Sequence, residues 1–596
     1  MKTRMAATAA SLFLFSCVLN AQSITSGDIA GSVTDPSGAS IPDATVTIKN
    51  NGTGATNTAT TNGTGGYRFS LLPPGTYMLS VTQSGFGTQQ RQVQARIGTT
   101  TQADFTLQLS QSSQTVTVTE SGSSIQTQNG DITTTISAQQ LANLPNPGGD
   151  LSYIAQIAPG TVMNTQAGYG NFSSFGLPAT SNLFTYNGQY DNDPFLNLNN
   201  SGATNLLLGQ NDVAEVSVVN NGYSGQYGSL AGSQVNYVSK SGQNQFHGNA
   251  LYYWNGRVMN ANDWFNNAGG APRPFDNVNQ WAAGLGGPIV KNHTFFFWDY
   301  EGLRVVLPTS NPATIPSPQF EQATIANLTA TGLSASVPFY QNMFNLYNGA
   351  KGANTATPTE GGGCNNFSGL PAAVPCTLTF RATAGNFTSE YLTSLRIDQT
   401  LGSNDRLFGR VQTDHGTQAT YTDPINPLFN ATSVQPEYQG QLSETHTFGS
   451  RAVNQLVFSG QWYSAIFGNL NPTATQAAFP TNLYFNDGSL TTLGGENFLW
   501  PQGRNVQQWQ AVDDFSWTLG NHTIKFGVNW RRSDVTDFDY GQYSTGYLAV
   551  QSLQDFYNGG ASGSFLQQSF PTKLLQPSSS GTLALMCRMS SKSGAH

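Results

Sequence analysis

The stretch from Asn211 to Gly248, NDVAEVSVVNNGYSGQYGSLAGSQVNYVSKSGQNQFHG, decides the fold class of this chain. Two runs within it, VAEVSVV and SQVNYVSK, alternate apolar and polar residues, which predicts two short strands. The Gly, Asn and Ser cluster between them is typical of turns and loops. The stretch closes on Lys240-Ser241-Gly242 and Phe246-His247-Gly248, and from about Gln245 onward the sequence consists of longer alternating segments.

The composition favours a protein with several β-rich domains. At 596 residues the chain is too long for one ordinary globular core. Only 9% of its residues are charged, compared with roughly 25% in soluble proteins, and 11% are aromatic. This mixture suits a transmembrane barrel that is polar inside and apolar outside, although a secreted β-rich adhesin would look similar. The net charge of −8 and the lack of a basic run argue against a nucleic-acid partner.

The alternating segments after Gln245 place their charges almost wholly on one face of each predicted strand, as the wall of a transmembrane barrel requires. One face carries Ile524, Phe526, Val528 and Trp530; Thr393, Leu395 and Ile397; Leu407, Gly409 and Val411; and Leu456, Phe458 and Trp462. The opposite face carries Lys525, Asn529 and Arg531; Ser394, Arg396 and Asp398; Arg406, Arg410 and Gln412; and Gln455, Ser459 and Gln461. A soluble sandwich would not require this asymmetry.

The second half of the opening stretch resembles the junction between plug domain and first barrel strand in TonB-dependent outer-membrane receptors. The matching pieces are the "YG…AG…VN.VSKSG.N.FHG" residues between Tyr227 and Gly248. The resemblance is most specific to the Oar-like branch, whose members carry an N-terminal carboxypeptidase-regulatory-like domain. It implies a mostly β protein: a transthyretin-like β-sandwich, an α+β plug domain over residues 124–241, and an antiparallel outer-membrane β-barrel over residues 245–575.

Residues 28–109 read as the small sandwich. The pieces "G.V.D..G..IP.A.V.I", "G.Y.F" and "LPPG.Y" occur in order, and they resemble the carboxypeptidase-regulatory-like family. Turns that contain proline and glycine separate the alternating runs, which is typical of a sandwich. The module carries no set of catalytic residues and no His or Glu residues at the spacing of metal ligands, so we expect a structural or docking domain.

The N-terminus is typical of an exported protein. Lys2 and Arg4 precede an apolar run from Ala6 to Leu19, which predicts a signal peptide over residues 1–21 with cleavage after Ala21. Lipid attachment at Cys17 is the alternative, but Phe15 fits that processing site poorly. No later run of 18 apolar residues exists, so we expect no transmembrane helix.

Residues 114–120 allow two interpretations. Thr115, Val116, Thr117, Val118 and Thr119 form a β-branched run that can be one more strand of the sandwich. The run also resembles a TonB box, the extended segment that pairs with a TonB-type periplasmic energy-coupling protein. Such a segment can add to the sheet edge of a partner through main-chain hydrogen bonds.

The plug region contains two predicted short helices and one predicted strand and turn. Residues 137–145 read as a capped helix stopped by proline, and residues 151–158 as a second amphipathic helix. The strand and turn over residues 184–191 resemble a plug element whose loops touch ligand in the family. This resemblance implies ligand-contact candidates, although turn-forming roles explain the same residues: Tyr186, Asn187, Tyr190 and Asp191.

Connections between the barrel strands alternate in length. Residues 402–405 and 520–522 are predicted tight turns, whereas residues 307–387 and 468–503 are predicted extracellular loops. Cys364 and Cys376 share the first long loop and can form a disulfide in an oxidising compartment. Their spacing matches no zinc site, and we expect no bound metal and no cofactor.

The barrel pattern stops before the end of the chain. We count about nine candidate strands between Phe246 and Val535, whereas the family barrel has 22 strands. Residues 576–596, which include Cys587, show no strand alternation and no terminal aromatic residue. The sequence therefore predicts a truncated barrel followed by an aberrant tail, as a frameshift would produce.

The resemblance implies an outer-membrane receptor or transporter, with its N-terminal domain in the periplasm. It would bind and import a large ligand, a siderophore, an oligosaccharide or a peptide, in contact with outer-membrane lipid. The alternatives are a surface adhesin or structural β-protein, and a non-functional receptor fragment. An enzyme is not expected, because the carboxylate pairs Asp513-Asp514 and Asp537/Asp539 lack a base, nucleophile or metal set, and solvated loop charges explain them.

Overall fold

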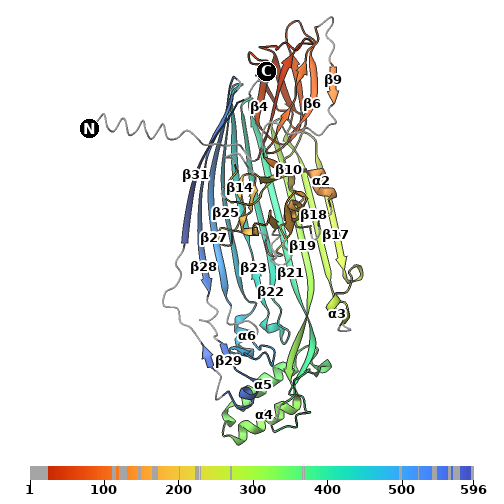
Figure 1. Cartoon of the computed structure of the whole chain (residues 1–596), viewed down its shortest axis with the longest axis vertical. Coiled ribbons are helices and arrows are strands. Elements are labelled where there is room, and N and C mark those ends of the chain that lie inside the picture. The colour runs from red at the N-terminus through yellow and green to blue at the C-terminus, as the bar shows by residue number, and fades with distance from the viewer. Residues whose placement is uncertain are drawn as a thin grey trace, which may run out of the picture.

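The computed structural model of the chain contains four parts: an N-terminal sandwich, a plug, a curved antiparallel sheet, and a helical loop unit (Figure 1). The structure describes residues 25–109, 116–119, 131–144, 146, 149–163, 172–199, 202–221, 227–228, 230–268, 272–364, 367, 369–494, 500–520, 522–539, 547–560, 565–567 and 578–591. The predicted signal peptide, with Cys17, and Thr115 lie outside these residues.

The sandwich packs two small sheets face to face. One sheet has the order β4-β1-β7, with β8 also pairing β1, and the other has the order β3-β2-β5-β6-β9. Inward residues such as Val46 and Leu79 alternate with more exposed ones, as the sequence predicts, and they form one buried core with Ile29 of β1. The strands are β1 (Gly27–Thr34), β2 (Thr45–Asn50), β3 (Thr56–Thr60), β4 (Gly66–Leu72), β5 (Gly75–Thr82), β6 (Gln89–Ala95), β7 (Thr100–Gln102), β8 (Phe105–Thr106) and β9 (Val116–Thr119).

The plug is built on a five-stranded sheet of order β10-β15-β16-β13-β14. The two strands expected from the opening stretch are confirmed as β15 and β16, and they pair antiparallel. Plug strands are β10 (Ile132–Ser137), β11 (Thr161–Met163), β12 (Phe172–Ser174), β13 (Leu183–Tyr186), β14 (Gln189–Tyr190), β15 (Val213–Asn221) and β16 (Gln234–Ser239). Its helices are α2 (Ala138–Asn143), η2 (Leu151–Ile157) and η3 (Ala179–Ser181).

The helix predicted over residues 137–145 is confirmed in type and start. Ser137 caps α2 through a capping box with Gln140, which satisfies two backbone N–H groups that a helix start leaves free. The second predicted helix is present as the 3₁₀ helix η2, and Asp150 caps its start: the Asp150 carboxylate accepts from the N–H of Ser152. Asp150 also accepts from the N–H of Leu207, so it joins this helix to a distant plug loop.

The barrel wall is one long sheet in which neighbours in the chain pair antiparallel, and β17 and β31 end its order among the described strands. Its strands are β17 (His247–Gly256), β18 (Asn277–Val290), β19 (Thr294–Pro316), β20 (Thr357–Pro358), β21 (Thr377–Leu401), β22 (Asp405–Tyr421), β23 (Ala431–Val434), β24 (Glu437–Phe448), β25 (Ala452–Asn469), β27 (Gln502–Leu519), β28 (His522–Asp539) and β31 (Ser578–Ser591). None of the described helices is long and apolar enough to cross a membrane.

Two expectations about this wall are wrong. The sequence predicts a tail without strand structure, but Ser578–Ser591 forms β31 and pairs with β28 along its length. It also predicts a long loop over residues 307–387, but β19 and β21 continue into this segment until Pro316 faces Thr377. Prolines at 308, 312 and 316 lie within β19, and proline is ordinarily a strand breaker.

The loop unit lies at the end of the wall opposite the sandwich and has its own core (Figure 1). Phe320, Tyr347, Phe479 and Phe556 come from four different helices or their flanks and are buried together. A disulfide joins Cys364 and Cys376, whose Cα atoms are 5.0 Å apart. Its elements are α4 (Pro318–Ala330), η5 (Ser334–Ser336), α5 (Val337–Asn348), η6 (Ala353–Thr355), η7 (Pro427–Phe429), α6 (Pro472–Ala478), β26 (Asn482–Phe485), β29 (Tyr547–Val550), α8 (Leu553–Tyr557) and β30 (Phe565–Gln567), and η4 (Arg257–Met259) and α3 (Trp264–Ala268) follow β17.

The sandwich is tied to both the wall and the plug. Asp28 is buried between Arg68 of the sandwich and Lys525 of β28, with its Oδ2 2.8 Å from Lys525 Nζ. Burial raises the pKa of Asp28, whereas Lys525 and Arg68 lower it. The effect of the two cations together is larger, so the pKa of Asp28 lies below its ordinary value. On the plug side, the Ile97 N–H donates to Glu215 Oε2 at 3.1 Å.

Glu215 makes the junction between sandwich and plug sensitive to pH. Burial raises the pKa of Glu215 to about 7, and the Ile97 N–H and Arg96 offset this only in part. The folded chain therefore holds this proton more tightly than the unfolded chain. Protonated Glu215 therefore adds to the free energy of unfolding. This contribution is complete below the unfolded pKa of about 4.5 and is lost as the pH rises through the folded pKa of about 7, a total of about 3 kcal/mol.

We predict that Glu215→Gln removes this part of the pH dependence. Denaturant unfolding of the native chain should give a free energy that falls between pH 5 and pH 8, and the variant should show a flatter profile. An unchanged profile in the variant would contradict the assignment of the effect to Glu215.

Candidate functional site

The polar inner face of the barrel wall holds the plug, and this plug seat is the candidate functional site. Inward side chains of the wall strands are buried and polar, whereas their neighbours along each strand are apolar and exposed on the outer face. The predicted alternation is confirmed at Arg410, Gln461 and Lys525, which face inward, and at Phe458 and Trp530, which face outward.

Arg410 of β22 forms the central ion pair of the seat. Its Nη2 lies 2.7 Å from Asp212 Oδ2 of the plug, and both side chains are about 1% exposed. The guanidinium carbon lies 4.1 Å from the ring centroid of Tyr186, and the Tyr186 hydroxyl donates to Asp212 Oδ2 at 2.8 Å. Burial and Asp212 raise the pKa of Tyr186, so this hydroxyl stays protonated and remains a donor.

Two carboxylates of β19 hold the plug loop that leads into β15. Glu301 accepts from the N–H of Gly209 at 3.0 Å and of Asn211 at 2.6 Å. Asp299 accepts from Asn211 Nδ2 at 2.6 Å, and Lys240 Nζ donates to the Asn211 carbonyl at 2.7 Å. Glu301 of the wall thereby satisfies two backbone N–H groups of this loop, and Lys240 of the plug satisfies the Asn211 carbonyl.

Inward glutamines of the wall bind the β13–β14 hairpin of the plug. Gln441 Nε2 donates to the Tyr186 carbonyl at 2.7 Å and its Oε1 accepts from Asn187 Nδ2 at 3.0 Å. The remaining contacts run from Gln439 Nε2 to Asp191 Oδ1 (2.8 Å), from Gln508 Nε2 to the Tyr190 carbonyl (2.9 Å), and from the Tyr190 N–H to Gln510 Oε1 (2.9 Å). An amide side chain both donates and accepts, so one glutamine can serve two plug groups.

The four ligand-contact candidates therefore all lie in this seat. Tyr186, Asn187, Tyr190 and Asp191 are between 2% and 7% exposed and contact the wall. Burial raises the pKa of Asp191 to about 6 despite the hydrogen bond from Gln439. The sequence located the hairpin, but it did not single out the wall glutamines, Asp299 or Glu301. Their inward register is the one signal in the sequence that points to them.

The segment that resembles a TonB box is strand β9, at the edge of the sandwich. Val116–Thr119 pairs in parallel with Gln89–Gln92 of β6, and β9 is the last strand in the order of that sheet. The expectation of one more sandwich strand thus matches this structure. An edge strand keeps one side of its backbone open to further pairing.

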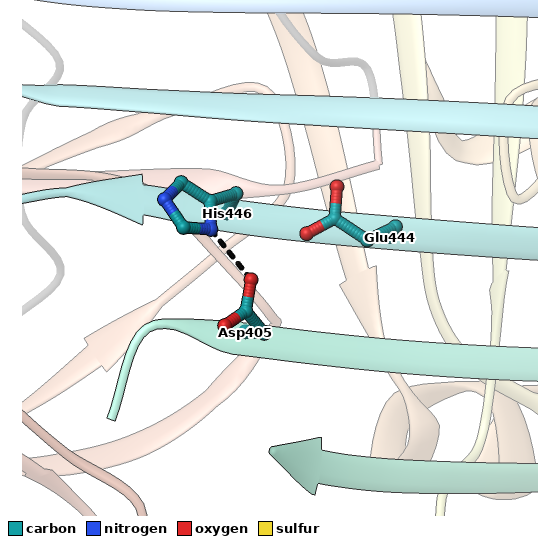
Figure 2. Close-up of side chains that lie close together, drawn as sticks. All are labelled: Asp405, Glu444 and His446. Atoms are coloured by element: carbon teal, nitrogen blue, oxygen red, sulfur yellow. Dashed lines mark hydrogen bonds and ion pairs between the residues drawn. The ribbon is translucent and has the colours of Figure 1, made fainter. Parts of the chain in front are cut away.

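Asp405, Glu444 and His446 form the cluster with metal-ligand spacing among the described residues. Their donor atoms lie within 4.8 Å of one another. His446 Nδ1 lies 2.5 Å from Asp405 Oδ1 across the β22–β24 pair, and Glu444 lies two residues before His446 (Figure 2). The sequence shows no such spacing because cross-strand pairing brings the residues together.

The carboxylate pairs noted in the sequence lie within strands of the barrel wall. Asp513 and Asp514 lie within β27 and not in a loop, because β27 extends to Leu519. Asp513 accepts from Asn454 Nδ2 of the neighbouring strand at 2.8 Å. Asp537 and Asp539 belong to the end of β28.

Comparisons with known proteins identify the family. Residues 238–581 match the outer membrane beta barrel domain, and residues 28–108 match the carboxypeptidase regulatory-like domain. The chain belongs to the outer membrane β-barrel family. The resemblance to TonB-dependent, Oar-like outer-membrane proteins with an N-terminal regulatory-like domain is confirmed, and the protein is placed in the outer membrane.

The similar proteins are longer than the matched part of this chain. The TonB-dependent transporter Oar of Myxococcus xanthus is 26% identical over 253 residues, which cover 40% of this chain and 23% of that protein. The Escherichia coli outer membrane transporter YddB aligns at TM-score 0.49 and 12% identity, over 77% of this chain and 54% of its own. The siderophore receptor PirA of Pseudomonas aeruginosa aligns at TM-score 0.39 and 11% identity, over 68% and 49%.

We predict that Arg410→Gln loosens the plug. The substitution leaves the buried Asp212 carboxylate without its cation, which costs about 3–5 kcal/mol. Amide hydrogen exchange in β15 should therefore accelerate by about 100-fold or more, because local opening becomes easier.

The matched control is Arg532→Gln. Arg532 pairs with Asp534 on the outer face of the same wall, the side away from the plug, so its loss should leave exchange in β15 unchanged. Equal exchange rates in the Arg410 variant and the native chain would contradict the central role of the Arg410–Asp212 pair.

Proposed function

We propose that the protein is a TonB-dependent receptor that captures a large ligand at its loop unit and admits it after the plug is displaced. The observation that supports this proposal is the polar character of the plug seat. The plug has its own apolar core, and hydrogen bonds and an ion pair join it to the wall, beside one small apolar cluster of Leu208 with Leu303 and Leu392.

A polar seat suits a plug that must move. A hydrogen bond exchanged for water costs only about 0.5–1.5 kcal/mol, whereas an apolar interface would expose its whole area when it opens. The core of the plug, which includes Val216, Val235 and Tyr237, lies within its own sheet and helices and would stay intact during displacement.

The ligand class is broad within this proposal: a siderophore, an oligosaccharide or a peptide. The loop unit is the proposed capture site because it lies at the end of the wall opposite the sandwich (Figure 1). Its core fixes α4, α5, α6 and α8 on one another, and the disulfide closes the segment before β21. A stable loop surface lowers the ordering cost of binding.

We further propose that the β9 segment is the coupling segment for a TonB-type periplasmic protein. Its position on a sheet edge supports this role, because the same backbone groups can pair with a strand of the partner. Main-chain pairing would provide most of the affinity, so the backbone should matter more than the side chains.

The test is binding of the full chain, in detergent, to the purified periplasmic domain of the host's TonB-type protein. Val118→Pro removes one N–H donor and fixes the backbone, and should weaken binding by about tenfold or more. Val118→Thr keeps the β-branched shape and should bind as the native chain does. Equal binding of the proline variant would contradict the coupling role of β9.

A further inference from the structure

The outer face of the barrel carries an apolar groove with a glycine floor. Gly409 of β22, Gly440 of β24 and Gly460 of β25 lie on three adjacent strands, and Gly440 faces Gly460 directly. A Cβ placed on Gly440 would meet no atom within 4 Å, so the missing side chain leaves open space on the outer face. The groove encloses about 700 Å³, a volume within the range of small-molecule sites.

The walls of this groove are large apolar side chains. Trp462, Trp509, Tyr438, Phe458 and Leu442 line it, and all of them are exposed on the outer face. Tyr438 and Trp462 stack with ring centroids 5.7 Å apart, and Phe458 and Trp509 stack at 5.9 Å. These stacked pairs fix the sides of the groove.

The groove continues into a polar cluster along the same two strands. Beyond the Gly409–Leu442 pair, the next outward pairs are Leu407 with Glu444 and Asp405 with His446. Two residues of a strand span about 6.6 Å, so the carboxylates begin directly beyond the groove. The cluster lies at the end of the wall next to the sandwich, where Arg406 donates to the Leu71 carbonyl.

The cluster lies at the level of an aromatic row. His446 contacts Phe448 edge-on at 4.2 Å, Phe448 lies 6.1 Å from Phe515, and Phe515 lies 4.8 Å from Phe526. Such rows mark the interface between hydrocarbon and headgroups around membrane barrels. An apolar groove in the hydrocarbon layer therefore ends at an acidic cluster in the headgroup layer of the periplasmic leaflet.

We propose that this groove and cluster form a site for a phospholipid with an ammonium headgroup, such as phosphatidylethanolamine. One acyl chain occupies the glycine-floored groove, and the ammonium group donates hydrogen bonds to the carboxylates of Asp405 and Glu444. His446 holds the Asp405 carboxylate: an ionised carboxylate only accepts, so the imidazole Nδ1–H is the donor of their 2.5 Å contact.

The chemistry of the cluster selects among lipids. Two carboxylates attract a cationic headgroup and repel an anionic one, and the contact is stronger in a partly water-excluded layer than in water. The surrounding membrane supplies the lipid, so the site does not depend on the transport proposal but only on placement in the outer membrane. A divalent cation held by the same three residues is the competing occupant (Figure 2).

The test is native mass spectrometry of the full chain, purified from outer membranes in mild detergent. Phosphatidylethanolamine and phosphatidylglycerol with matched acyl chains are added in parallel titrations, with and without EDTA. We expect one phosphatidylethanolamine per chain to bind about tenfold or more tightly than phosphatidylglycerol, because charge-assisted hydrogen bonds discriminate by at least this factor.

Two variants separate the headgroup from the acyl chain. The double variant Asp405→Asn/Glu444→Gln should lose the preference for phosphatidylethanolamine, and Gly440→Leu should weaken the binding of both lipids by filling the groove. The matched controls are Asp513→Asn, an acidic residue of the same pairing row facing Leu456, and Ala511→Leu, opposite Phe458 and outside the groove. Both controls should bind as the native chain does.

Folding of every variant is verified by the shift of its band on unheated gels. Equal binding of the two lipids by the native chain would overturn the proposal, as would unchanged selectivity in the double variant. Loss of phosphatidylethanolamine binding with EDTA would assign the cluster to a divalent cation and would also overturn it.

Discussion

The rest of the structure depends on one constraint: in lipid, every backbone N–H and C=O of a spanning segment must be paired within the protein. Long antiparallel strands satisfy this constraint, and their two-residue period then sends alternate side chains to opposite faces. The outer face becomes apolar, as at Phe458 and Trp530, and the inner face becomes polar. The plug can bind only to groups that this inner face presents.

The plug seat follows from that polar inner face. Arg410 is buried, so its charge is balanced by Asp212 and by the ring of Tyr186. The glutamines need both donors and acceptors, and the main chain of the β13–β14 hairpin provides them. The resulting interface is specific, because each polar group needs its partner, and one small apolar cluster around Leu208, Leu303 and Leu392 adds to it.

The sequence predicts the faces but not the partners. The alternation around Arg410, Gln461 and Lys525 follows from a local period, and the structure confirms it. Which glutamine meets which plug carbonyl depends on strand register and on the orientation of the plug, and neither is a local property. For the same reason the sequence does not reveal the Asp405–His446 contact, since 41 residues separate the two side chains.

Two stretches of strand escape sequence prediction for a different reason. Prolines at 308, 312 and 316 argue against a strand, yet β19 continues through them because β21 pairs along its whole length. The segment from Ser578 to Ser591 has only a weak local pattern, but its register places Leu583 opposite Trp530 and Leu585 opposite Val528. In both cases a long partner strand outweighs weak local preference.

A cysteine cross-link between plug and wall tests the plug seat most directly. Asn187 Nδ2 donates to Gln441 Oε1 at 3.0 Å, whereas the next residue of the wall, Leu442, is 59% exposed on the outer face. With a short bifunctional thiol reagent that spans the length lost from the two side chains, the double variant Asn187→Cys/Gln441→Cys should form the cross-link efficiently, and Asn187→Cys/Leu442→Cys should not. Equal cross-linking of the two pairs, or none in the first, would contradict a plug seated on the polar inner face.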